Sequence, residues 1–137
     1  AKELLEAPCV IELSDFSEES VAFLMNILLF KFQCYLSHQP ETSELRRIIA
    51  VEEAHNVFRK TSLEDTGRAL SNNYFDKMLA EIRSSGTGLI ISDQRPRLLS
   101  EAVMANTAVK VIHSLSEYED RELVGLAANL SSFQKVK

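Results

Sequence analysis

Four short apolar runs, each followed by polar or acidic residues, constrain the fold of this 137-residue chain more than any other feature. They occupy residues 10–13, 47–52, 89–92 and 109–115, and longer segments separate them. The second and third runs lack strict alternation, which is typical of strands covered on both faces. Strands that alternate with helices imply right-handed crossovers and a mainly parallel sheet. We therefore expect a single α/β unit over residues 1–137, with about four strands and flanking helices.

The segments between the runs have the spacing and the end residues of helices. Ser17, or Asp15 with Glu18, can cap the first helix, and Ser116 with Glu119 forms a capping box for the last. Glycines 86 and 88 are expected to end the third helix. The predicted helices cover residues 18–37, 67–84, 98–105 and about 117–130.

The longest apolar stretch, residues 21–36, is interrupted by Asn26, Lys31 and Gln33. A membrane-spanning helix needs about 20 apolar residues in a row. The stretch therefore predicts a helix buried on most of its sides inside a layered fold, and no membrane span.

Composition and charge exclude several classes of protein. A net charge of −5 argues against a module that coats DNA or RNA. Two cysteines cannot make a disulfide framework, so we expect Cys9 and Cys34 to be small buried side chains with free thiols. The start of the chain lacks the basic and then apolar pattern of a signal peptide, which favours a cytoplasmic location.

The residues that follow two of the apolar runs are candidates for chemistry, because ligands bind at the carboxyl ends of parallel strands. The second run ends in Glu52 and Glu53, followed by Ala54 and His55. In phosphoryl transfer, one carboxylate of such a pair holds Mg²⁺ through water and the other orients the attacking water. The alternative is a pair of solvated glutamates at the start of a helix. We expect His55 to cap that helix or to pair with Glu53, and His113 to be structural.

Two motifs in order carry a resemblance to a known family. The stretch IIAVEEAH, followed about 40 residues later by GLIISDQRP, resembles the HerA/FtsK superfamily of P-loop ATPases. Leu99-Ser100, Asn106 and the acidic segment 117–120 follow in the order typical of its members. The resemblance covers most of residues 8–130 and implies a partial P-loop NTPase (RecA-like) core from a DNA translocase or helicase.

The resemblance implies roles for individual residues. Glu52 matches the Walker B acid that supports Mg²⁺, and Glu53 matches the catalytic glutamate that polarises water. Gln94 matches the polar sensor of the γ-phosphate. Family members usually carry Thr just before this glutamine, where this chain has Asp93.

An arginine finger is also implied by the resemblance. Arg83 lies before the sensor strand, where the family often places an arginine that reaches into a neighbouring subunit's site. The alternative for Arg83 is an ordinary solvated arginine at a helix end. Arg95 and Arg97 are other candidates for the finger.

A phosphate-binding loop is missing from these 137 residues. No G-x-x-x-x-G-K-[ST] pattern occurs, and there is no Gly-Lys pair. We therefore expect the C-terminal part of a larger ATPase domain, inactive alone and completed by the rest of that domain. ATP and Mg²⁺ are expected in the parent protein, and no cofactor is expected in this chain by itself. The parent is expected to form a homo-oligomeric ring and to contact DNA, with the polar loop 59–67 as the candidate contact.

Loss of the phosphate-loop strand would leave residues 109–115 without their usual neighbour. We expect this strand either to pair with the sensor strand or to pair between chains. A second function class stays open, namely a non-catalytic interaction or assembly module that has lost nucleotide binding. A third, a response-regulator-like module, fits the acidic residues at strand ends but not the SDQRP motif.

Overall fold

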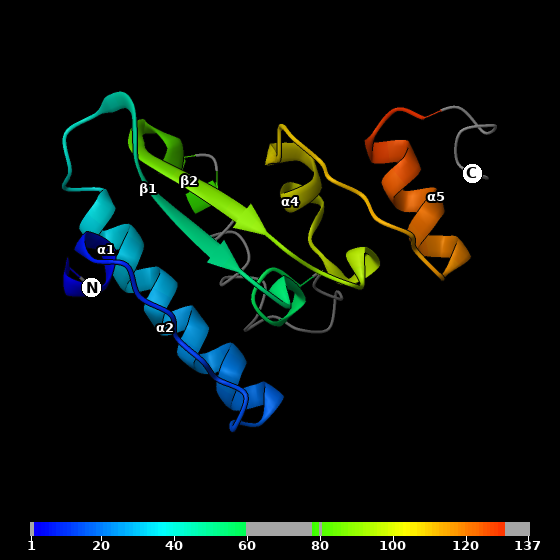
Figure 1. The fold of residues 1–137 in the computed structure, drawn as a ribbon, viewed down its shortest axis with the longest axis horizontal. Helices are drawn as coiled ribbons and strands as arrows, with labels where there is room; N and C mark the ends of the chain where they lie inside the picture. The colour runs from blue at the N-terminus through cyan, green and yellow to red at the C-terminus, as the bar shows by residue number, and fades with distance from the viewer. Residues whose placement is uncertain (1, 60–77, 80, 131–137) are drawn as a thin grey trace.

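The computed structural model describes residues 2–59, 78–79 and 81–130, and Figure 1 shows how their elements are arranged. The helices and strands are α1 (Lys2–Glu6), α2 (Glu18–Leu36), β1 (Thr42–Val51), β2 (Ser85–Ile91), α4 (Glu101–Asn106) and α5 (Tyr118–Ala127). Three short 3-10 turns join them: η1 (Ala54–Asn56), η2 (Ile82–Ser84) and η3 (Pro96–Leu98).

Helix α2 forms as predicted and begins at a side-chain cap. The Ser17 hydroxyl accepts a hydrogen bond from the Ser20 backbone N–H at 3.3 Å, and Glu18 and Glu19 occupy the first turn. A serine cap and acidic residues at this end stabilise a helix, because they satisfy free N–H groups and complement the helix dipole. Ser17 alone is therefore the cap, without Asp15.

The burial of α2 differs from the prediction. Only Leu29, Phe32 and Leu36 are buried, whereas Phe23 and Phe30 are 65% and 51% exposed. The expectation of a helix buried on most of its sides is therefore wrong. By length and composition α2 could cross a membrane, but core helices of soluble proteins and signal sequences pass the same test, so this is weak support for a span.

The described sheet has two parallel strands, β1 and β2, paired from Ile48 with Gly88 to Val51 with Ile91. Alternate side chains of the strands point to opposite faces. On one face Ile49, Val51 and their neighbours in β2 pack against the core beneath α2. On the other face Ile48 and Ile90 are 56% and 55% exposed. The prediction that these strands are covered on both faces is therefore wrong.

Both strands begin earlier than their apolar runs. In β2, Ser85 and Thr87 are 6% and 3% exposed, and their hydroxyls lie 2.9 Å apart in a hydrogen bond. The Ser85 hydroxyl also bonds the Ile82 carbonyl oxygen at 2.7 Å. Such partners remove the cost of burying hydroxyl groups, so polar residues extend the strand. Gly86 and Gly88 consequently lie inside β2 and do not end a helix.

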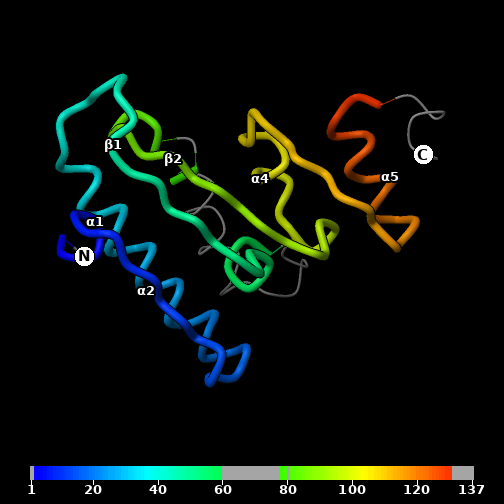
Figure 2. The backbone as a smooth tube through the Cα atoms, in the orientation of Figure 1, coloured from blue at the N-terminus to red at the C-terminus, as the bar shows by residue number. Residues whose placement is uncertain are grey.

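Two of the four predicted strands are not strands. Residues 10–13 and 109–115 carry no regular secondary structure, and Val10, Val109 and Val111 are more than four-fifths exposed. Figure 2 shows the backbone of residues 109–115 as an extended stretch between α4 and α5. In the part of the chain that the structure describes, β2 pairs only with β1. The predicted pairing of 109–115 with the sensor strand is therefore wrong, and the alternative, pairing between chains, stays a prediction.

The later helices are shorter than predicted. Helix α4 starts at Glu101 after the turn η3, and α5 has Glu117, not Ser116, at its N-cap position. The predicted helix 67–84 falls largely outside the described residues. Residues 78, 79 and 81 are helical and lead into η2.

One apolar core joins α2, the ends of the strands and the turn η1. Its largest fully buried side chains are Leu29, Phe58 and Met78. Burial of each such side chain contributes about 1.5–3 kcal/mol. The backbone N–H of Ser100 donates to the Phe58 carbonyl oxygen at 2.7 Å, which attaches the start of α4 to this core. The core therefore anchors the loops that follow both strands.

Candidate functional site

The loops after β1 and β2 lie side by side because strand pairing continues past the strand ends. The Ser92 N–H donates to the Val51 carbonyl oxygen at 2.9 Å, and the Ala54 N–H donates to the Ser92 carbonyl oxygen at 3.3 Å. These bonds place Glu53 next to Gln94, whose Nε2 donates to Glu53 Oε1 at 2.9 Å. Two residues singled out from separate motifs are thus in direct contact at the carboxyl ends of parallel strands.

Glu53 has an unusual backbone conformation. Its φ of 49° and ψ of 47° lie in the left-handed region, immediately before the turn η1. A residue with a side chain adopts this conformation at a cost of about 1 kcal/mol. The turn aims the Glu53 side chain, which is 46% exposed, toward the loop after β2.

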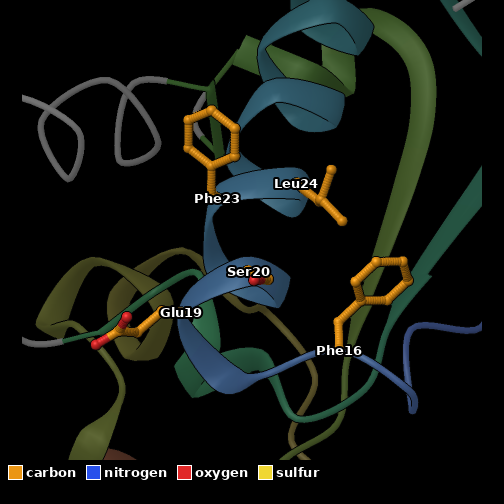
Figure 3. A pocket seen from close by; sticks show the side chains of 5 residues that line it. All are labelled: Phe16, Glu19, Ser20, Phe23 and Leu24. Atoms are coloured by element: carbon orange, nitrogen blue, oxygen red, sulfur yellow. The ribbon is translucent and has the colours of Figure 1, made fainter.

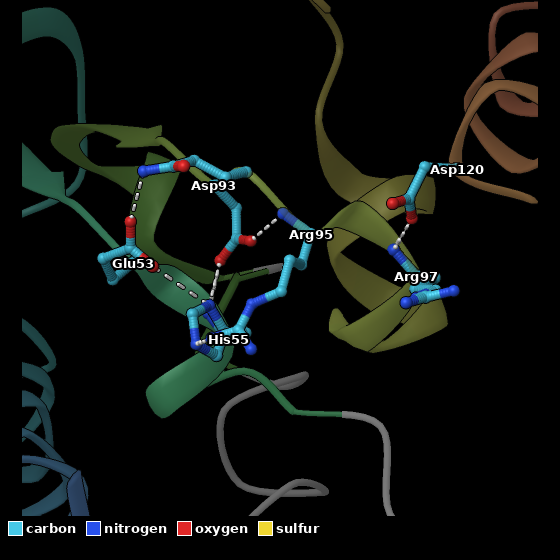
Figure 4. A network of polar contacts seen from close by, with 7 residues as sticks. Glu53, His55, Asp93, Arg95, Arg97 and Asp120 are labelled. Carbon is cyan, nitrogen blue, oxygen red and sulfur yellow. Dashed lines mark hydrogen bonds and ion pairs between the residues drawn. The ribbon is translucent and has the colours of Figure 1, made fainter. Parts of the chain in front are cut away.

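A buried polar cluster lies beside this pair (Figure 4). The Asp93 and His55 side chains are only 2% and 5% exposed. Asp93 Oδ2 lies 2.8 Å from His55 Nδ1 and also accepts the His55 backbone N–H at 2.7 Å. Asp93 Oδ1 accepts the Arg95 backbone N–H at 2.6 Å. On the far side of the imidazole, Arg95 Nη2 lies 2.5 Å from His55 Nε2.

His55 makes the expected polar contact with Glu53, but its shorter contact is with Asp93. Its Nδ1 is 3.6 Å from Glu53 Oε2, too long for a hydrogen bond, and much closer to Asp93. From the sequence, Asp93 stood out only as a departure from the threonine that the family usually carries at this position. The Asp93–Arg95 contact could have been predicted, because an Asp side chain in a loop often accepts the backbone N–H of the residue two positions later.

The other predicted site residues lie in three different places. Glu52 is exposed directly after Val51 at the end of β1. Arg83 is exposed in η2, at the start of β2, so about 20 Å of strand separates it from the loop that carries Gln94. Within one chain it does not meet Glu53, and its predicted role in a neighbouring subunit stays a prediction.

Both alternative arginines are engaged within the chain. Arg95 contacts His55, as described above. Arg97 Nη1 donates to Glu119 Oε2 at 2.9 Å, and the Arg97 backbone N–H donates to Asp120 Oδ1 at 3.0 Å. Asp120 is 3% exposed and was not predicted as a structural residue. These contacts attach the start of α5 to η3.

Three further sequence predictions can be placed. Cys9 and Cys34 are exposed, so the expectation of buried thiols is wrong. His113 is exposed on the segment that is not a strand, so its predicted place on a strand is wrong. Of the candidate DNA loop 59–67, only Arg59 belongs to the described residues, and the remainder lies outside them.

No group of three or more potential metal ligands is present among the described His, Cys, Asp and Glu residues. An open hollow at the start of α2 is lined by Phe16, Glu19, Ser20, Phe23 and Leu24 (Figure 3). It shares no residue with the polar cluster and holds no predicted site residue. Among the described residues, the predicted site residues Glu53 and Gln94 are in contact at the ends of β1 and β2.

Parallel strands with flanking helices, and an acid–amide contact at the strand ends, define an α/β fold compatible with part of a P-loop NTPase core. The chain is similar to the DNA double-strand break repair helicase HerA of Sulfurisphaera tokodaii, with 28% identity over 122 residues. The match covers 84% of this chain and 23% of that relative, so the chain spans about a quarter of its length. No protein-family model matches the chain, and no solved structure matches it. The similarity indicates a distant HerA-like relationship.

Proposed function

We propose that this chain is the Walker B and sensor part of the ATPase core of a DNA-acting motor of the HerA/FtsK type. The contact between Glu53 and Gln94 carries the proposal, because it joins the two motifs at the carboxyl ends of neighbouring strands. The similarity to HerA over 84% of the chain supports the same class.

The exposed side chains at this edge fit a magnesium–nucleotide complex. Hydrated Mg²⁺ binds carboxylate oxygens; the Glu53 carboxylate contacts the amide of Gln94, and the preceding residue, Glu52, is exposed at the end of β1. In the proposed reaction Glu52 supports the hydrated Mg²⁺ ion. Glu53 orients the attacking water, and Gln94 contacts the γ-phosphate. The metal ion supplies charge neutralisation at the phosphates when it is bound.

The rest of the site belongs to the parent protein in this proposal. A phosphate-binding loop with its lysine comes from the remainder of the ATPase domain, and Arg83 from one subunit reaches the site of the next in a ring. Contact with DNA is likewise proposed for the whole protein. The isolated chain is proposed to hydrolyse no ATP.

The test is ATP hydrolysis by the full-length gene product that contains this chain. Glu53→Gln keeps the size of the side chain but removes the negative charge and replaces one acceptor oxygen by an NH2 donor. We expect kcat to fall by at least about 100-fold while binding of a fluorescent ATP analogue stays within a few-fold of wild type. Glu12→Gln, an exposed carboxylate at a distant sequence position, is the matched control and should leave kcat unchanged.

Two outcomes would overturn the proposal. One is a Glu53→Gln protein that hydrolyses ATP within two-fold of the wild-type rate. The other is a full-length protein that binds no ATP, which would favour the assembly module. The assembly module is retained as the second candidate function because these 137 residues contain no phosphate-binding loop.

A further inference from the structure

The cluster of Asp93, His55 and Arg95, in which the Asp93 and His55 side chains are buried and Arg95 is exposed, is not explained by the proposed roles of Glu53 and Gln94. A carboxylate that is 2% exposed is costly unless donors surround it. Asp93 has three such donors, namely the His55 imidazole and the backbone N–H groups of His55 and Arg95. The cluster is thus a complete hydrogen-bonding unit inside the loops.

The positions of these donors relate the cluster to the Glu53–Gln94 pair. The His55 N–H that Asp93 binds lies two residues after Glu53, and the Arg95 N–H comes directly after Gln94. One carboxylate therefore joins the backbone beside Glu53 to the backbone beside Gln94. A threonine at position 93, as in the family that the chain resembles, has a single side-chain oxygen and could not accept all three bonds in this way.

The contacts of the imidazole define where its proton lies. A guanidinium group has only donors, so the Arg95 contact requires His55 Nε2 to be an acceptor without a hydrogen. The hydrogen is then on Nδ1, where it is donated to Asp93 Oδ2 at 2.8 Å. An imidazole with hydrogens on both nitrogens would direct an N–H at the Arg95 guanidinium.

We propose that Asp93 is a positioning residue for the reaction site. Through His55, held as the neutral Nδ1–H tautomer against Arg95, it clamps the loop after β1 to the loop after β2. This clamp keeps the Glu53 backbone in its left-handed turn and its carboxylate against Gln94. The catalytic consequence rests on the proposed function, whereas the clamp itself and its tautomer do not.

The first experiment measures the tautomer in the wild-type 137-residue chain by long-range ¹H–¹⁵N correlation NMR of the imidazole. We expect a pyrrole-type Nδ1 and a pyridine-type Nε2, the reverse of the usual preference of free histidine. In Arg95→Gln the Asp93 carboxylate still accepts the Nδ1 hydrogen, so we expect Nδ1 to stay pyrrole-type while Nε2 becomes free to take a second hydrogen. A wild-type His55 with its hydrogen on Nε2, or on both nitrogens, would overturn the proposal without requiring any variant to fold.

The second experiment measures steady-state ATP hydrolysis by the full-length gene product. Asp93→Asn replaces one acceptor oxygen by a donor, so the three N–H groups can no longer all be accepted. We expect kcat to fall at least about 10-fold with KM for ATP within about two-fold, because the variant misplaces Glu53 but leaves nucleotide contacts elsewhere. Asp15→Asn, on the exposed turn before α2, is the control and should match wild type.

A conservative variant separates positioning from bulk packing. In His55→Asn the side-chain amide can still donate to Asp93 near the position of Nδ1, whereas His55→Ala has no donor. We expect the asparagine variant to retain at least about five-fold more kcat than the alanine variant. Equal kcat values for the two variants, or a wild-type kcat for Asp93→Asn, would overturn the clamp. Failure of Glu53→Gln to slow hydrolysis would overturn the proposed function but leave the tautomer result intact.

Discussion

Gln94 donates a hydrogen bond to Glu53 across 2.9 Å, although the two residues are 41 positions apart in the chain. In this structure one oxygen of the Glu53 carboxylate, which is proposed to orient water, therefore already accepts a hydrogen bond from the Gln94 amide. The Gln94 amide keeps a second N–H and a carbonyl oxygen for a ligand, so ligand binding and the orientation of Glu53 are linked through one side chain.

The backbone conformation of Glu53 leads to a prediction about stability. Glycine at an ordinary helix or strand position is about 0.5–1 kcal/mol less stable than alanine, but at a positive φ the order reverses. We expect Glu53→Gly to be more stable than Glu53→Ala by about 1 kcal/mol in urea unfolding. The neighbouring residue Glu52 has no positive φ and is the control, with glycine less stable than alanine there. The same order at both positions would contradict the prediction.

Gly86 lies in β2 with a φ of +69°, where a side chain meets two obstacles. A Cβ atom there would collide with the Glu44 carbonyl oxygen and lie 2.7 Å from Thr42 Cγ2. We expect Gly86→Ala to lower the free energy of unfolding by about 2–4 kcal/mol. At Gly88 the nearest atom to a Cβ is the end of the Leu45 side chain at 3.2 Å, so Gly88→Ala should cost less than half as much. Equal losses in chemical denaturation would show that the strained φ is unimportant.

Two leucines on α2 test how the core is distributed around that helix. Leu29 is 1% exposed and Leu24 is 37% exposed. We expect Leu29→Ala to reduce the free energy of unfolding by about 2–5 kcal/mol, because it opens a cavity. Leu24→Ala should cost about 1 kcal/mol or less. If the two variants unfold at the same denaturant concentration, α2 packs differently from the arrangement in Figure 1.

Tyr35 provides a prediction about alkaline pH. Its hydroxyl donates to Glu6 Oε1 at 2.8 Å, and this bond raises the pKa of Tyr35 above its usual value. Burial and the Glu6 charge raise this pKa further, while Arg47 opposes them. Because the folded-state pKa exceeds the unfolded one, the stabilisation is complete below about pH 10 and is lost as pH rises through the folded value.

Ultraviolet absorbance at alkaline pH measures this ionisation. We expect a phenol step above the normal range that disappears in Tyr35→Phe. In Glu6→Gln the same step should move toward lower pH, since the acceptor loses its charge. A step that stays in place in Glu6→Gln would mean that Glu6 does not contact Tyr35 in solution.

Local sequence signals predicted the elements that depend on local interactions. Helix α2 has a serine cap and acidic residues in its first turn, and it was predicted to within one residue at each end. The C-terminal parts of β1 and β2 were predicted from their apolar runs. The idea that chemistry would lie just after these runs identified Glu53 and Gln94, which the structure brings into contact. Their catalytic roles remain predictions.

Long-range partners explain most of what was missed. Residues 10–13 and 109–115 have the apolar content of strands, but pairing depends on a neighbour that no local pattern specifies. Asp120 is buried and accepts the backbone N–H of Arg97, 23 positions earlier in the chain, whereas the buried Ser85 and Thr87 bond each other. Burial of polar residues therefore follows from the assembled structure and is invisible in a run of sequence letters.

The parallel pairing of β1 with β2 also determines the order in which this chain can fold. Ile49 is 40 residues from its partner Leu89, so closing the loop between them costs about 3 kcal/mol before sheet hydrogen bonds compensate. Helix α2 can form early from local contacts, whereas the sheet must wait for distant segments to meet. During synthesis on the ribosome, β1 emerges well before β2. Its open edges and the exposed Ile48 face are then available to other chains, so this interval carries a risk of aggregation.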